Sequence, residues 1–122
     1  MAYELVWEPL GLYNRFYDRF TMDEFKESVE QVQADARFSS LRYAINDLRD
    51  IGELDTTAIS FGDIIAAEIN AHLKRVDMKI AVITQDSVLI RFLQNYTEMP
   101  VTVLPLKIFP TVAAARLWLQ PG

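Results

Sequence analysis

The stretch from residue 46 to residue 59, NDLRDIGELDTTAI, carries most of the side chains that could do chemistry. It follows an apolar run at 42–47 and precedes a helical pattern. It contains four acids and two adjacent threonines, namely Asp47, Asp50, Glu53, Asp55, Thr56 and Thr57. Open α/β sheets bind ligands beyond the carboxyl ends of their strands. One interpretation is therefore a site lined by these acids that binds a ligand or a metal ion. Solvated acids in a loop of an acidic protein are the other, and we favour this second interpretation.

The threonines add another chemistry, because a hydroxyl at a helix N-terminus can accept a phosphoryl group. Unpaired N–H groups there would favour a phosphate by roughly 0.3–1 kcal/mol. The acids around Thr57 would repel its added charge of about −1.5 to −2. Alternatively, Asp55, Thr56 or Thr57 caps the helix, which contributes about 1 kcal/mol. We expect the cap, and we keep Thr57 and Thr56 as candidate phospho-acceptors.

The residue types exclude several catalytic and metal chemistries. The chain has no cysteine and one histidine, which excludes thiol catalysis, disulfides, Cys-based zinc sites and His-rich metal sites. The histidine, His72, falls on the apolar stripe of a predicted helix, and no nucleophile is paired with it. We therefore expect a protein that is not an enzyme, with no cofactor and no metal site.

Turn and strand signals predict a five-stranded sheet. Strands at 3–8 and 12–19 flank Pro9-Leu10-Gly11, where Pro and Gly suit a tight hairpin turn. Pro105 cannot donate to a ladder, so the last strand is expected at a sheet edge. The continuous apolar run KIAVIT is typical of a strand covered on both faces. The three strands that follow the hairpin are predicted at 42–47, 79–84 and 101–109.

Capping signals predict four helices between and after these strands. Thr21 and Glu24 form a capping-box pattern before a helix that runs to about residue 35. The other three helices are predicted from near Thr57 to about Arg75, after Asp86 or Ser87, and after Thr111. The order ββαβαβαβα predicts an α/β fold, with a mostly parallel five-stranded sheet, an N-terminal β-hairpin and four helices in one domain, 1–122.

Composition narrows the partners and the location. Hydrophobic residues make up 51% of the 122 residues and charged residues 24%, which is typical of a globular chain. The net charge of −5 argues against nucleic acid and anionic membranes as partners. The start, MAYELVWEPLG, lacks the pattern of a signal peptide. No apolar run approaches the roughly 20 residues that span a bilayer. We expect a cytoplasmic protein that does not insert into membranes.

Three segments resemble the STAS domains of anti-sigma factor antagonists, and the small bacterial SpoIIAA-like (STAS/SEC14-type) proteins in particular. Residues 47–58, DLRDIGELDTTA, are similar to the strand, acidic loop and helix start of that family. The segments KIAVITQDSVLIRFLQNYTEM and IFPTVAAARLWL resemble its later strand–helix units. Thr57 and Ala58 stand where phosphorylatable members usually have a Ser and a Gly.

The resemblance implies a non-enzymatic regulatory or protein-interaction domain. It places a partner-binding surface at Asp55, Thr56, Thr57, Ala58 and Phe61. The alternative is a module for a small apolar, lipid-like ligand, with a pocket lined by Phe61, Ile65, Phe92 and Trp118. A homodimer is also a candidate assembly, through the hairpin at 12–19 or the edge strand with Pro105.

Overall fold

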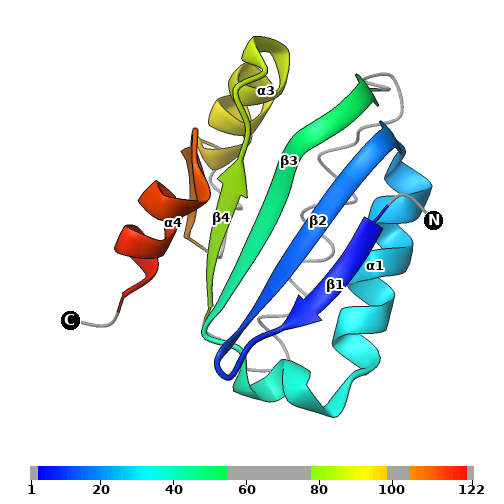
Figure 1. The fold of residues 1–122 in the computed structure, drawn as a ribbon, viewed down its shortest axis with the longest axis vertical. Helices are drawn as coiled ribbons and strands as arrows, with labels where there is room; N and C mark the ends of the chain where they lie inside the picture. The colour runs from blue at the N-terminus through cyan, green and yellow to red at the C-terminus, as the bar shows by residue number, and fades with distance from the viewer. Residues whose placement is uncertain (1–2, 55–77, 99–104, 121–122) are drawn as a thin grey trace.

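The computed structural model describes residues 3–54, 78–98 and 105–120, which form a five-stranded sheet with helices on both faces (Figure 1). The chain opens with an antiparallel hairpin of β1 (Tyr3–Trp7) and β2 (Gly11–Phe20). Glu8 and Gly11 close its turn through two backbone hydrogen bonds, with N···O distances of 2.8 and 3.4 Å. The predicted hairpin is therefore confirmed.

Three further strands run parallel to β2. They are β3 (Tyr43–Leu54), β4 (Lys79–Ile83) and β5 (Leu106–Phe109). The strands lie in chain order from β1 to β5, so β5 is at an edge, as Pro105 predicts. Each parallel connection steps to the next strand in the same direction. In the two connections whose helices the structure describes, at 22–34 and 87–97, right-handed crossovers place both helices on one face of the sheet.

The described ranges contain three α-helices. α1 (Met22–Ala34) leads into a short 3-10 helix (Ala36–Ser40), α3 (Ser87–Thr97) follows β4, and α4 (Val112–Leu119) follows β5. The predicted helix from near Thr57 to about Arg75, which includes His72, lies outside the described residues. None of the described helices is long and apolar enough to cross a membrane.

The predicted helix caps are confirmed in all three helices. The Thr21 hydroxyl accepts the N–H of Glu24 at 3.2 Å, at the start of α1. At the start of α3, Asp86 Oδ1 accepts the N–H of Leu89 at 2.9 Å. Thr111 does the same for Ala114 at 3.2 Å and begins α4. Each cap satisfies a backbone donor that has no partner inside its helix.

The core is divided between the two faces of the sheet. Successive residues of a strand point to opposite faces. In β4, Val82 packs with Leu89 and Leu93 of α3, whereas Ala81 and Ile83 pack with Ala115 of α4. α1 covers the same face as α3 through Leu12, Val32, Phe38 and Leu41. The helix α4 therefore covers the opposite face, and β4 is buried on both sides, as its apolar run predicts.

The strand predicted at 42–47 is longer than expected. β3 runs from Tyr43 to Leu54, so Asp50 belongs to the strand together with Asp47, which the predicted range already included, and the interpretation of Asp50 as a loop residue is wrong. The reason is the length of β2, which pairs with β3 along its whole length, as far as Phe20 opposite Leu54. A polar sequence can remain extended when a neighbouring strand satisfies its backbone hydrogen bonds.

Gly11 permits a close contact between the hairpin and β3. A Cβ atom at this position would lie 2.2 Å from carbons of the Tyr43 ring. The Tyr43 hydroxyl donates to Glu8, and Arg116 of α4 donates two bonds to the same carboxylate at 3.1 and 2.7 Å. The bonds from Arg116, together with that from Tyr43, lower the pKa of Glu8 although burial opposes the shift. Because Gly11 has no side chain, the Tyr43 ring can lie against it and reach Glu8. The carboxylate of Glu8 then links the hairpin turn to Arg116 of α4.

We expect the substitution Gly11→Ala to lower the free energy of unfolding by about 1–3 kcal/mol, the usual range for overpacking. The added methyl group must displace a ring that its bond to Glu8 holds in place. Thermal unfolding followed by circular dichroism measures the change.

Gly52→Ala is the matched control, because among the described residues a Cβ there meets only the Asp18 carbonyl oxygen, at an ordinary 3.8 Å. We expect this variant to unfold within about 1 kcal/mol of the parent protein. Equal losses in the two variants would contradict the assigned role of the Gly11–Tyr43 contact.

Candidate binding site

β3 extends past its neighbour β4 at the carboxyl end of the sheet. The pairing of the two strands ends at Asp47, opposite Ile83, and β3 then continues to Leu54. β4 stops there because a local turn begins, in which the Thr84 hydroxyl accepts the N–H of Asp86 at 3.1 Å. The half of β3 beyond Asp47 consequently lies beside this turn instead of beside a strand.

A bulge in β3 marks the same point. Arg15 and Tyr17 of β2 are two residues apart, but the residues of β3 that pair with them, at 47 and 50, are three apart. An extra residue in one strand reverses the alternation of its side chains between the two faces. Leu48 and Ile51 can therefore both pack against the Tyr3–Phe16 cluster on one face, although they are three residues apart.

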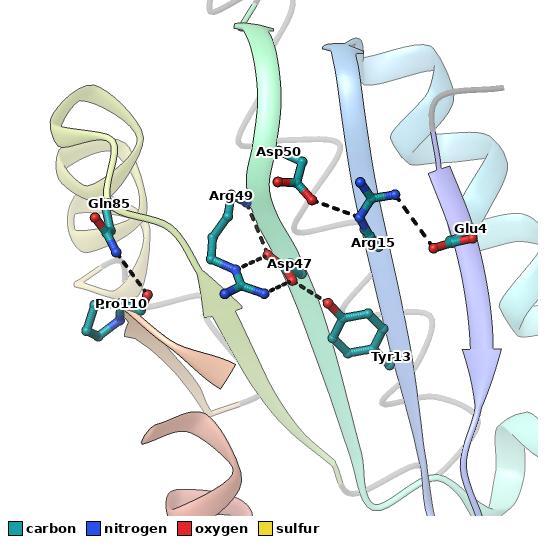
Figure 2. A network of polar contacts seen from close by, with 8 residues as sticks. All are labelled: Glu4, Tyr13, Arg15, Asp47, Arg49, Asp50, Gln85 and Pro110. Atoms are coloured by element: carbon teal, nitrogen blue, oxygen red, sulfur yellow. Dashed lines mark hydrogen bonds and ion pairs between the residues drawn. The ribbon is translucent and has the colours of Figure 1, made fainter. Parts of the chain in front are cut away.

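Asp47 is the buried centre of a polar network at this bulge (Figure 2). Its side chain is 1% exposed. The Tyr13 hydroxyl of β2 donates to one of its oxygens. Arg49 donates from Nε and Nη2 at 2.9 and 2.7 Å, and its backbone N–H donates at 3.1 Å. Figure 2 shows Asp47 between these two side chains, so the carboxylate links β2 to the bulged segment of β3.

These contacts fix the charge of each group. Burial by itself would raise the pKa of Asp47, but the hydrogen bonds from Arg49 and Tyr13 outweigh it, and the pKa lies below its usual range. Burial and the bond to Asp47 both raise the pKa of Tyr13. The same carboxylate raises the pKa of Arg49. At neutral pH the network is therefore an ion pair with a neutral phenol, and Arg49 is held in one place.

A second ion pair lies beside this network. Asp50, the first residue beyond the bulge that pairs with β2, accepts from Arg15 Nε at 2.8 Å. Arg15 also lies 3.7 Å from a carboxylate oxygen of Glu4 in β1. Figure 2 shows the three side chains spanning β1, β2 and β3. Asp47 and Asp50 are thus both engaged by arginines, and the described residues contain no group of three or more His, Cys, Asp or Glu that could hold a metal ion.

A pocket of about 380 Å³ opens beside the half of β3 that continues past β4. Leu48, Ile51 and Leu89 give it apolar walls, while Arg49 and Gln85 bring polar groups to it. The accessible lining is more polar than apolar, so the pocket suits a ligand that makes hydrogen bonds as well as apolar contacts. The full lining comes from β3, from the turn after β4 and from α3: Leu48, Arg49, Ile51, Gly52, Thr84, Gln85, Asp86 and Leu89.

The residues predicted for the partner-binding surface begin one position after β3. They lie outside the described residues, as do the candidate phospho-acceptors and half of the predicted apolar pocket: Asp55, Thr56, Thr57, Ala58, Phe61 and Ile65. Their roles stay predictions.

The predicted apolar pocket is corrected by the positions of its other two members. Phe92 of α3 packs in the cluster of Val82, whereas Trp118 of α4 packs in the cluster of Ile83. These clusters lie on opposite faces of the sheet, so Phe92 and Trp118 do not line one cavity. Trp118 instead stacks near Phe109, with a ring-centroid distance of 5.6 Å.

The sequence analysis missed the roles of Tyr13, Arg49 and Gln85. One signal was available, because Leu48 and Ile51 are apolar residues three apart in a segment with strand neighbours. Such a spacing does not fit a regular strand, and inside an extended segment it is consistent with a bulge. Asp47 and Arg49, two apart in the same segment, then become candidates for one face.

Comparison with known proteins supports the fold alone. The sequence matches no family model and no curated protein. The structure is similar to that of an uncharacterized protein of the DUF3478 family from Shewanella loihica PV-4, which is described as having a SpoIIAA-like fold. The TM-score is 0.59 at 16% sequence identity, over 98% of this chain and 93% of the other. The predicted SpoIIAA-like α/β fold is confirmed, including its mostly parallel five-stranded sheet.

We expect Asp47→Asn to lower the free energy of unfolding at pH 7 by about 1.5–3 kcal/mol, the range for hydrogen bonds to charged groups. Because folding lowers the pKa of Asp47, its contribution is complete above the pKa of the unfolded chain, near 4, and is lost as the pH falls through the folded pKa. The variant should therefore lose less stability than the parent between neutral and acidic pH. Urea unfolding at several pH values measures this.

Asp50→Asn is the matched control in the same strand, because its pair with Arg15 is exposed. Exposed ion pairs contribute about 0–1 kcal/mol. An Asp47→Asn variant that matched this control at neutral pH would contradict the central role of the buried carboxylate.

Proposed function

We propose that this chain is a non-enzymatic protein-interaction domain, and that its partner binds at the pocket between β3 and the turn that follows β4. The observation that carries the proposal is the pocket itself, at the carboxyl end of the parallel strands, where polar groups of Arg49, Gln85 and other lining residues lie beside apolar side chains. Crevices at this end are where open α/β sheets bind ligands.

The polar groups of the pocket favour binding over reaction. Arg49 is paired with Asp47, and the Asp86 carboxylate accepts the N–H of Leu89 as the cap of α3. The Thr84 hydroxyl accepts a backbone N–H from the turn. These groups serve to shape the pocket and to offer hydrogen bonds at its rim, which is what recognition of a partner requires.

The proposed site also adjoins the predicted partner surface in the sequence. Asp55 follows Leu54, the last residue of β3, so the surface predicted at 55–61 continues from the strand that forms one wall of the pocket. A regulatory role like that of anti-sigma factor antagonists, with Thr57 as its phospho-acceptor, is a narrower form of the same proposal.

Photocrosslinking in cells of the source organism tests the site. A photoreactive phenylalanine derivative placed at Gln85, an exposed residue of the pocket lining, should link the chain to one discrete protein. Gln94 is the matched control position, because it is exposed on α3 and is not part of that lining. Denaturing electrophoresis followed by mass spectrometry reads both adducts.

Adduct formation at Gln94 as strong as at Gln85 would contradict the assigned site. Native mass spectrometry of the unlabelled protein covers the alternative function. A non-covalent small-molecule adduct, together with the absence of any protein adduct at Gln85, would favour a ligand-binding module.

A further inference from the structure

Within residues 3–54, 78–98 and 105–120, the half of β3 beyond Asp47 has no strand on its β4 side. β2 pairs with it as far as Leu54. On the other side, the described chain forms the turn at 84–86 and then α3, and no described backbone group pairs with residues 48–52 there. A strand carries N–H and C=O groups on both edges, so such an edge is a template for another extended chain.

The pocket provides space for that chain. It is bounded by Leu48 to Gly52 on one side and by Gln85 and Leu89 on the other. Four steps of about 3.3 Å from residue 48 to residue 52 give an edge of at most about 13 Å, and the register of β3 against β2 shifts before Asp50 and again after Ile51. A chain lying there would continue the line of β4, which ends at Ile83.

The lining also specifies the side chains of such a segment. Successive residues of an extended chain point to opposite faces. One face would meet the apolar group of Leu48, Ile51 and Leu89. The other would meet Arg49, whose side chain is 42% exposed and which gives two of its five N–H donors to Asp47.

Charge complementarity then selects an acidic residue opposite Arg49. Asp86 is the acid of the pocket lining, and its carboxylate is directed to the backbone N–H of Leu89. Asp47 balances the charge of the guanidinium, which keeps three N–H donors that Asp47 does not use and is the cationic group of the pocket lining. Arginine pairs well with carboxylates because its planar fork matches their geometry.

We infer that the partner is recognised as an extended segment that adds to the β4 side of β3, with an apolar residue in the pocket and an adjacent acidic residue at Arg49. This inference rests on the proposed function and names the form of the partner. The backbone edge gives the affinity, and the two side-chain contacts give the register and direction of the added strand.

A library of displayed random peptides, selected on the full chain, tests the inference. Each enriched peptide is measured for binding to the parent protein and to two variants with the same substitution, Gln85→Trp and Gln94→Trp. The first fills the rim of the pocket, and the second changes the exposed face of α3. Peptides with single backbone N-methyl groups, one at each position, are then compared by titration.

We expect enriched peptides to carry neighbouring apolar and acidic residues, and to bind the Gln94→Trp variant but not the Gln85→Trp variant. N-methylation should weaken binding about three- to tenfold at alternate positions, because only every second N–H of an added strand faces β3. Replacing the acidic residue of the peptide by glutamine should weaken binding to the parent protein more than to an Arg49→Gln variant.

Peptides that compete for the pocket without an alternating N-methyl pattern would overturn the added strand and leave the proposed function standing. If no peptide is enriched, or if binding ignores Gln85→Trp, the inference fails as well. The crosslink at Gln85 separates these cases. If the crosslink forms although no peptide binds the pocket, the inference alone fails. If neither the crosslink nor peptide binding is observed, the proposed binding site fails too.

Discussion

The buried carboxylate of Asp47 is the constraint on which the carboxyl end of this sheet depends. An ionised group that is 1% exposed is unstable unless hydrogen-bond donors surround it. Those donors come from two strands, since Tyr13 belongs to β2 and Arg49 to β3. The network therefore fixes how the two strands lie against each other at the point where their register changes. Tyr13 could not keep Asp47 as its partner if the register of β2 against β3 moved by one residue, whereas Arg49 and Asp47 belong to the same strand.

The bulge makes the rest of the sequence in β3 consistent with burial. Before it, Ile45 and Asp47 share the face that α4 covers in part. After it, Ile51 joins Leu48 on the opposite face, while Asp50 reaches Arg15. A regular strand would have placed one of these two apolar residues with the charged ones. The bulge thus reconciles an apolar spacing of three residues with a strand, and it places Arg49 at the rim of the pocket.

The fold could be predicted from the sequence to a large extent, because its signals are local. The Pro9–Gly11 turn, the caps at Thr21 and Thr111 and the edge position of Pro105 each involve a few neighbouring residues. The site could not be predicted in the same way. In the sequence, Asp47 is an acid at the end of a short predicted strand. Its burial follows only once β2 is known to run beside it, since the hydroxyl that donates to it lies 34 residues away at Tyr13. The prediction that Phe92 and Trp118 line one pocket was wrong for a similar reason. The face that a helix covers is decided by strand order and not by the composition of the helix.

The pocket follows from strands of unequal length, and each length has its own local cause. β4 ends where Thr84 and Asp86 turn the chain into α3, and β3 continues because β2 supports it to Leu54. At the opposite end of β3, the pair of Arg116 with Glu8 ties α4 to the hairpin turn, which keeps that helix beside the amino end of the strand (Figure 1). The same side chains line the pocket and belong to the core, since Leu48 and Ile51 pack against the Tyr3–Phe16 cluster and Leu89 packs with Val82. The geometry of the site therefore depends on the packing that stabilises the fold.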